Sequence, residues 1–154
     1  MTIQETINTI SKDQLPKKTV LNIIYTQNLI LDKFNEILKP YDLSGEQFNV
    51  LRILRGQKGC PANMCVIQER MIAKTSNTTR LVDKLLIKEL VTRKICPENR
   101  RKIEVQITDK GLDLLVQLDP KVTGYEKKFS DNLTSKELES LNHLLEKFRL
   151  NNNN

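Results

Sequence analysis

The amino-acid sequence predicts a mainly α-helical protein with one small β-hairpin, an α+β fold forming a single domain over residues 1–154. Apolar residues recur every three or four positions through most of the chain, as they do on the buried face of a helix. Only five glycines and five prolines occur, which favours long helices over many turns. β-Branched residues alternate with polar ones in two short stretches, and these predict the hairpin.

The first third of the chain predicts one long helix and the start of a second. Residues 1–15 carry a weak apolar pattern that fits either a short helix or an arm. A regular helical pattern then covers residues 16–39, and Pro40 ends it. Ser44 and Gln47 have the spacing of a capping box, which predicts that another helix begins there.

Two further helices are predicted before the hairpin. Asn63 is suited to cap a short helix over residues 64–71. Thr75 or Ser76 is suited to cap the next helix, over residues 76–88.

The hairpin has strands over residues 90–93 and 103–107, joined by the polar and basic sequence CPENRRK. Thr108 then caps a long helix that could kink or divide at Pro120 and Gly124.

The C-terminal helix is predicted by another capping box. Thr134 and Glu137 have the same spacing as the earlier pair, and a strongly apolar helical pattern follows them.

Composition narrows the possible partners. The net charge is +6, which attracts polyanions, chiefly nucleic acid or an anionic membrane. No segment reaches the roughly 18 apolar residues that span a bilayer, and the N-terminus lacks the pattern of a signal peptide, so we expect a cytoplasmic protein without membrane partners.

The residues that bind metals or perform catalysis give no recognisable site. His143 is the only histidine, and the spacing of Cys60 and Cys65 is not typical of zinc binding. Glycine-rich phosphate loops and nucleophile motifs do not occur, so we expect neither an enzyme nor a bound metal or cofactor. We interpret Cys60, Cys65 and Cys96 as buried inert thiols; a thiol switch is the alternative.

The helix over residues 76–88 separates its side chains into two faces. Apolar residues and Thr78 lie on one face, which suits burial. The opposite face is polar, as a helix in the major groove of DNA requires. Arg100, Arg101 and Lys102 lie together at the hairpin tip, where they suit phosphates or a minor groove. Either feature alone is more often plain solvated surface, whereas both together indicate DNA binding.

From Asn63 to Gly111 the sequence resembles the winged helix–turn–helix of the MarR family of bacterial regulators. The resemblance rests on SNTTRLVDKLLIKELVTR followed by PENRRKIEVQITDKG. The wing signature of that family, DxRxxxVxLT, is represented here by Asn99, Arg101, Val105, Ile107 and Thr108.

The resemblance implies two lobes and a set of DNA contacts. Residues 44–111 would form the winged DNA-binding lobe, and residues 16–40 and 112–150 would form a helical dimerisation lobe. The implied DNA-binding residues are Ser76, Asn77, Thr79, Arg80 and Lys84 on the helix, and Arg100, Arg101 and Lys102 on the wing.

Two positions depart from the family pattern. Asn99 replaces the usual aspartate of the wing, and Glu89 replaces a glycine that commonly ends the recognition helix. A helix that ends without glycine either ends differently or carries strain at that residue. We also expect Asp83 to pair with Arg101, because an unpaired carboxylate would repel DNA phosphates.

The resemblance further implies a homodimer that reads a palindromic operator, most often as a ligand- or stress-responsive repressor. A small apolar or phenolic anion would bind in a crevice between the lobes. Tyr25, Phe34, Phe48 and Arg52 are candidates to line it, although they suit a protein core equally well. The alternative function is a winged-helix protein-interaction module without specific DNA binding.

Overall fold

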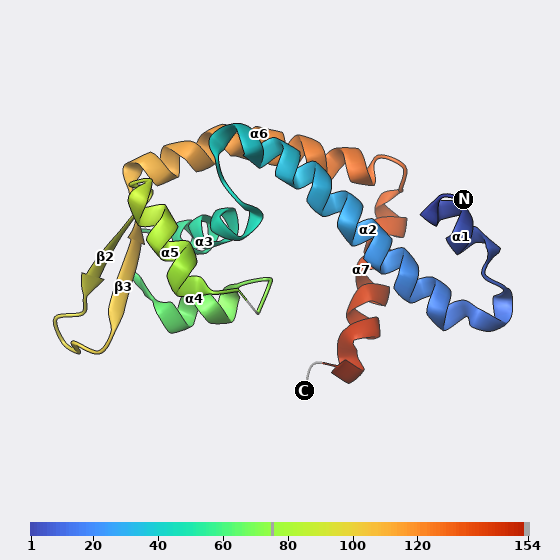
Figure 1. Ribbon diagram of the computed structural model, residues 1–154, viewed down its shortest axis with the longest axis horizontal. Coiled ribbons are helices and arrows are strands. Elements are labelled where there is room, and N and C mark those ends of the chain that lie inside the picture. Colours follow the sequence, from blue (N-terminus) through green and yellow to red (C-terminus); the bar gives the residue numbers. More distant parts are fainter. Residues whose placement is uncertain (75, 153–154) are drawn as a thin grey trace. The chain divides into compact units, whose positions relative to one another are not determined.

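A computed structural model describes residues 1–74 and 76–152, and it comprises two compact units, Met1–Leu118 and Asp119–Asn154. The protein is mainly helical with a small antiparallel sheet, as predicted (Figure 1). The helices are α1 (Ile3–Thr9), α2 (Leu15–Leu38), α3 (Gly45–Gly56), α4 (Met64–Arg70), α5 (Thr78–Ile87), α6 (Asp109–Ser130) and α7 (Ser135–Arg149). The strands are β1 (Ala62–Asn63), β2 (Val91–Ile95) and β3 (Ile103–Ile107), and short 3₁₀ turns cover Lys12–Gln14, Lys39–Tyr41 and Leu150–Asn152.

Side-chain caps begin most of these helices where the sequence predicts them. The Ser44 hydroxyl accepts a hydrogen bond from the Gln47 backbone N–H at 3.1 Å, and the Gln47 side chain accepts one from the Ser44 N–H at 3.2 Å. Thr134 and Glu137 make the equivalent pair of bonds at the start of α7. Asn63 caps α4 by accepting from the Val66 N–H at 2.9 Å.

The predicted start of α5 is wrong by one or two residues. Asn77 is the cap, and its side-chain oxygen accepts from the Arg80 N–H at 3.1 Å. Ser76 does not cap the helix because its hydroxyl donates instead to Glu46 Oε1 at 3.1 Å. The other candidate, Thr75, lies outside the described residues.

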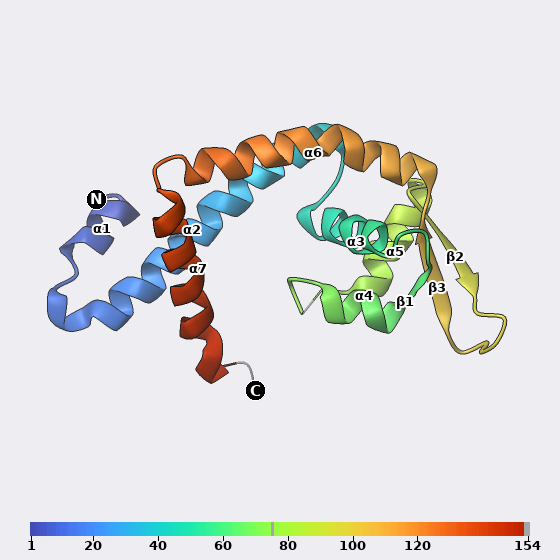
Figure 2. The same cartoon turned by 180° about the vertical axis from the view of Figure 1, so that it is seen from behind.

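The sheet has three strands in the order β1-β3-β2, one more than the predicted hairpin (Figure 2). In the β2–β3 hairpin, Val91 pairs with Ile107 and Arg93 pairs with Val105. β1 contributes only two residues, with Ala62 opposite Val105. A strand of this length leaves no periodic pattern in the sequence, which explains why it was not predicted.

The core of the first unit gathers side chains from α2 to α6 around the inner face of the sheet. Its fully buried members include Leu38, Leu51, Leu54, Ile67, Met71, Val82, Leu85, Val105 and Leu115. Gly111 allows the first turn of α6 to lie close to the backbone of Leu90, because a Cβ there would lie 2.4 Å from the Leu90 carbonyl oxygen. Any larger residue at Gly111 would therefore push the start of α6 away from Leu90 and Ile107 at the edge of the β2–β3 hairpin.

α6 is continuous despite Pro120, so the chain does not divide into two helices there. Proline removes one backbone donor and leaves the carbonyl four residues earlier without its helical partner. That residue is Val116, which is 65% exposed. The boundary between the two compact units falls beside this position, between Leu118 and Asp119.

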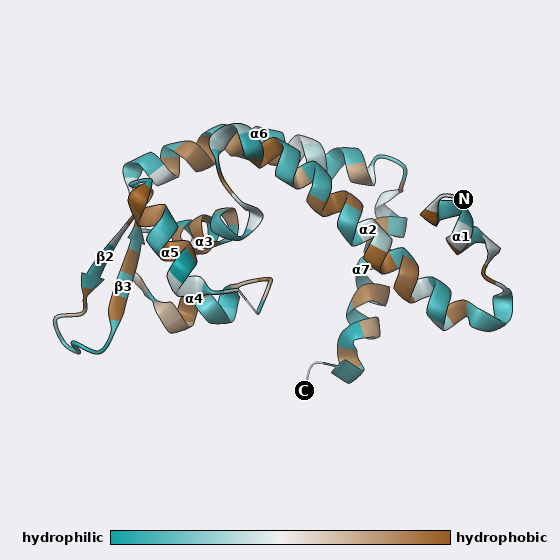
Figure 3. Ribbon diagram, in the orientation of Figure 1, coloured by the Kyte–Doolittle hydropathy of each residue, from teal (hydrophilic) through white to brown (hydrophobic). Residues whose placement is uncertain are grey.

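Apolar side chains also lie on the surface of α2 and α7. On α2, Val20, Ile24, Ile30 and Leu31 are between 37% and 47% exposed. Hydrophobic residues recur along the ribbon of α2 in Figure 3. On α7, Leu141, Leu144 and Phe148 are between 44% and 60% exposed. In the described part of the chain, no helix has both the length and the apolar character needed to cross a membrane.

Candidate nucleic-acid interface

α5 separates its two faces as the sequence predicts. Thr78, Leu81, Val82 and Leu85 are buried against the core. The exposed residues between them are Thr79, Arg80, Asp83 and Lys84. The helix therefore uses its apolar face for packing and presents a polar, mainly basic face to solvent.

Side-chain bonds from α3 and α4 hold the segment that leads into α5. The Thr78 hydroxyl donates to the Gln68 side chain of α4. The Ile72 backbone N–H donates to Asn49 Oδ1 on α3 at 3.0 Å. Ser76 is half-buried, and its hydroxyl donates to Glu46 of α3.

The tip of the β2–β3 hairpin is a tight turn organised by Asn99. The Asn99 side chain accepts from the Arg101 N–H at 3.1 Å, and its backbone carbonyl accepts from the Lys102 N–H at 2.9 Å. Cys96 donates its N–H to the Lys102 carbonyl at 2.9 Å and closes the turn. The Asn99 amide oxygen thus accepts the side-chain hydrogen bond of the wing turn, at the position where the resemblance implies an aspartate.

The ion pair that joins α5 to the wing is not the predicted one. Asp83 Oδ1 lies 2.7 Å from Nη1 of Arg93 on β2, so the expected pairing of Asp83 with Arg101 is wrong. Arg93 shares a face of the sheet with buried Val91, two residues earlier, and this face packs on α5. Arg101 belongs to the turn beyond the strands. The alternation of Val91 and Arg93 in the sequence could have identified Arg93 as the partner.

Five basic side chains remain exposed on α5 and the wing tip. They are Arg80, Lys84, Arg100, Arg101 and Lys102. Within residues 1–74 and 76–152, none of these five side chains forms a hydrogen bond or an ion pair. Unpaired cations on a helix and a neighbouring hairpin create a positive surface suited to phosphates.

The C-terminal end of α5 adopts the conformation that a glycine would favour. Glu89 has a φ of 59°, in the left-handed region that non-glycine residues rarely occupy. The Thr108 hydroxyl donates to the Glu89 carbonyl at 2.8 Å, and Lys110 Nζ donates to the Lys88 carbonyl at 3.0 Å. The predicted strain at Glu89 is therefore present, and the side chains of Thr108, just before α6, and Lys110, in its first turn, stabilise this conformation.

Three of the four candidate crevice residues lie close together. The rings of Phe34 and Phe48 meet edge to face with centroids 5.2 Å apart, and the Arg52 guanidinium lies 5.8 Å from the Phe48 centroid. Phe48 is buried, and no described contact joins Tyr25 to this group. A cleft of about 630 Å³ lies elsewhere, lined by Tyr41, Asp42, Lys88, Leu90, Lys110, Asp113, Leu114 and Gln117.

The expectation of buried thiols is wrong for two of the three cysteines. Cys60 and Cys65 are exposed, Cys96 is partly buried, and all three are free thiols. Among the described residues, no group of three or more histidine, cysteine or carboxylate side chains is placed to hold a metal ion.

Known proteins are similar to this chain in both sequence and architecture. Residues 43–103 match the model of the MarR family. The uncharacterized HTH-type transcriptional regulator YpoP of Bacillus subtilis (strain 168) is 34% identical over 130 residues, which covers 84% of this chain and 89% of YpoP.

Two solved structures share the fold. One is a mutant of Escherichia coli MarR complexed with operator DNA, with a TM-score of 0.73 and 24% identity, covering 88% of this chain and 95% of that one. The other is the organohalide-sensing RdhR regulator in its 2,4-dichlorophenol-bound form, with a TM-score of 0.81 and 19% identity, covering 94% and 83%. The winged helix–turn–helix, its basic surface and the similarity to YpoP together show that this chain belongs to the MarR family of DNA-binding transcriptional regulators.

Proposed function

We propose that this protein acts as a homodimer that binds a palindromic double-stranded operator and represses transcription in response to a small ligand or a stress. The observation that carries the proposal is the set of five exposed, unpaired cations on α5 and the wing tip, counted among the described residues. A helix flanked by a basic hairpin suits a major groove and the minor groove next to it.

Each candidate residue has a role that follows from its position. Ser76, Asn77, Thr79 and Arg80 lie at the start of α5, the end from which recognition helices contact bases. Lys84 lies one turn further along, where it would neutralise a phosphate. At the wing tip, Lys102 suits a phosphate, and Arg100 or Arg101 suits the minor groove. Because Asp83 forms its ion pair with Arg93, Arg100 and Arg101 are both available for DNA.

The homodimer is supported by the exposed apolar residues of α2 and α7. Side chains such as Ile24, Leu141 and Phe148 are nearly half exposed. Burial of these apolar side chains against a second copy would lower the free energy of the protein. A twofold dimer would place two copies of α5 about 34–36 Å apart, in successive major grooves of a palindrome.

A phenolic or other small apolar anion is the proposed signal, and the DNA in the cytoplasm is the proposed target. A structural neighbour bound to 2,4-dichlorophenol and another bound to operator DNA support these kinds of partner through their shared fold. Tyr25, Phe34, Phe48 and Arg52 stay the proposed crevice residues. The described contacts of Phe34, Phe48 and Arg52 suit either a ligand site or a core.

A gel-shift titration over a range of salt concentrations tests the proposal. The DNA is a pool of random sequences, from which the protein selects its preferred sites, compared with unselected DNA of equal length. We expect a selected palindrome that binds more tightly than random DNA and a steep loss of affinity as salt rises. Equal binding to both pools, even at low salt, would instead favour the protein-interaction module.

A further inference from the structure

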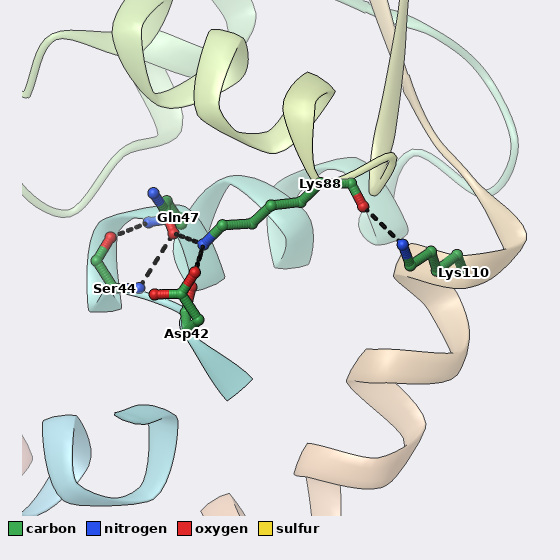
Figure 4. Close-up of polar contacts among 5 residues, drawn as sticks. All are labelled: Asp42, Ser44, Gln47, Lys88 and Lys110. Atoms are coloured by element: carbon green, nitrogen blue, oxygen red, sulfur yellow. Dashed lines mark hydrogen bonds and ion pairs between the residues drawn. The ribbon is translucent and has the colours of Figure 1, made fainter. Parts of the chain in front are cut away.

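The corner between α2 and α3 holds both ends of α5. At the start of α5, Glu46 accepts a hydrogen bond from the Ser76 hydroxyl at 3.1 Å. At the other end, the Lys88 ammonium lies 3.3 Å from Gln47 Oε1, 3.4 Å from Asp42 Oδ2, and donates to the Asp42 carbonyl (Figure 4). We name these five residues, Asp42, Glu46, Gln47, Ser76 and Lys88, the corner brace.

The brace combines partly buried groups with exposed ones, since the Asp42 side chain is 98% exposed and Glu46 is exposed. Gln47 is only 5% exposed, and its capping box with Ser44 fixes its position. The Lys88 side chain is 26% exposed, and Asp42 has a left-handed φ of 49°. This conformation ends the 3₁₀ turn of Lys39–Tyr41, and aspartate is among the non-glycine residues that adopt it most often.

The corner also continues directly from α2. Leu38 at the end of α2 and Leu43 in the corner are buried, and the Leu43 N–H donates to the Leu38 carbonyl at 3.4 Å. Phe34 of α2 packs edge to face on Phe48 of α3 with centroids 5.2 Å apart. The end of α2 and the first turns of α3 therefore form one packed element, to which the brace attaches α5.

The buried face of α5 packs on the core, and the brace adds polar contacts at both ends that further restrain the direction of the helix. In a dimer, the direction of α5 relative to α2 decides how far apart the two recognition helices lie and how they are rotated. We propose that the corner brace sets the half-site spacing that the dimer accepts, with Lys88 and Glu46 as positioning residues. This inference rests on the proposed function, because it requires a dimer that reads two half-sites.

The experiment measures affinity for three duplexes that differ only in spacing. The first carries the palindrome selected by the native protein, and the others have one base pair removed from or added to its centre. Each change moves one half-site by about 3.4 Å along the duplex and roughly 35° around it. We expect the native protein to bind both altered duplexes about tenfold more weakly or worse, a penalty comparable to a mismatched base pair.

Lys88→Met removes the cation but keeps a chain of similar length, so it removes the brace contacts at the C-terminal end of α5 and leaves the Thr108 and Lys110 contacts there in place. We expect it to bind the altered duplexes within about threefold of the selected one, well below the tenfold penalty typical of a mismatch. Lys33→Met is the matched control, because Lys33 pairs with Glu36 on the exposed surface of α2 and its loss removes the same charge. This control, and Lys88→Arg, should keep the native spacing penalty.

The other end of α5 provides an independent test should Lys88→Met fail to fold. Glu46→Ala removes the acceptor of the Ser76 hydroxyl and should reduce the spacing penalty, whereas Glu46→Gln retains an acceptor oxygen and should restore it. Circular dichroism and thermal melting identify the folded variants.

The outcomes separate this inference from the proposed function. If Lys88→Met and Glu46→Ala melt earlier but keep the native spacing penalty, the brace only stabilises the fold and the inference is overturned. It is equally overturned if Lys88→Met and Lys33→Met weaken all three duplexes to the same extent. Failure of the native protein to select any palindrome would instead overturn the proposed function.

Discussion

α5 and α7 have similar sequence patterns but differ in how many of their residues are buried. Each is an amphipathic helix that begins at a side-chain cap, Asn77 for α5 and Thr134 for α7. α5 has 10 residues and buries four of them, whereas α7 has 15 residues and buries none. The apolar face of α5 thus packs within its own compact unit, whereas none of the described residues of α7 is buried.

The polar faces of the two helices differ as well. α5 and the adjoining wing present basic side chains that are unpaired among the described residues. α7 carries both acidic and basic residues, so it has no surface of one sign. The difference indicates two kinds of association, with α5 suited to a polyanion and α7 suited to an apolar protein surface.

Removal of α7 should have the largest effect. We expect a chain truncated after Leu133 to lose the dimer, because the apolar residues of α7 would no longer be available for the interface. Operator affinity should then fall about a hundredfold or more, since the second half-site no longer binds intramolecularly. Light scattering and gel shift measure both effects. A chain ending at Arg149 is the control and should remain dimeric; a dimer that survives loss of α7 would contradict its role.

Matched leucine substitutions probe the difference between the two apolar faces. Leu85 of α5 is fully buried and Leu144 of α7 is 60% exposed. Leu85→Ala should lower the free energy of unfolding by about 2–5 kcal/mol through lost contacts and the cavity that it leaves. Leu144→Ala should change it by about 0.5 kcal/mol or less at low protein concentration, with a larger effect only as concentration favours the dimer. Urea denaturation at several protein concentrations makes the comparison, and equal losses at every concentration would remove the distinction.

The features of α5 and α7 that the sequence predicts correctly are local ones. A capping box such as Thr134 with Glu137 spans three residues, so its spacing is visible in the sequence. The buried face of α5 follows in the same way from the helical spacing of Leu81, Val82 and Leu85.

The wrong predictions depend on residues that are distant in the sequence. Ser76 does not cap α5 because its hydroxyl binds Glu46, thirty positions earlier. The partner of Asp83 depends on which face of β2 packs against α5, and this favours Arg93 over Arg101. The exposure of Cys60 and Cys65 likewise depends on the packing of α3, α4 and β1, which no single stretch of sequence specifies.

Loss of one arginine from α5 should cost less free energy than loss of Leu85. The cost falls on operator binding rather than on unfolding. If Arg80 contacts a base, Arg80→Ala should weaken operator binding by about 1–3 kcal/mol and relax the preference at one position of each half-site. A contact to phosphate would instead weaken binding to every sequence alike. Arg149→Ala removes the same charge from α7 and is the control. Gel shifts on the operator and on single-base variants decide the case; an Arg80→Ala protein that binds like the control would exclude Arg80 from the interface.

Glycine substitutions at the C-terminal ends of the two helices should have the smallest effect on the free energy of unfolding. At the end of α5 the substitution should stabilise the protein. Glu89 follows α5 with a φ of 59°, a conformation that costs an L-residue roughly 1–2 kcal/mol. Glycine avoids this cost in the folded state. It also makes the unfolded chain more flexible, which lowers the free energy of unfolding by about 0.5–1 kcal/mol. The contact of Glu89 with Lys110 contributes little, because the charged atoms are 3.4 Å apart and both side chains are well exposed. Glu89→Gly should therefore raise the free energy of unfolding by up to about 1 kcal/mol.

Leu150 provides the matched position at the end of α7. Its φ of −54° is right-handed, so glycine relieves no strain there and Leu150→Gly should leave stability unchanged or reduce it slightly. Urea denaturation of both variants measures the difference. If Glu89→Gly were as unfavourable as Leu150→Gly, the left-handed end of α5 would carry no strain, and the Glu89 side chain itself would be needed where α5 meets α6. A gain at Glu89 alone would show that α5 keeps its fixed end at a cost in stability, as expected of a helix whose direction matters for function.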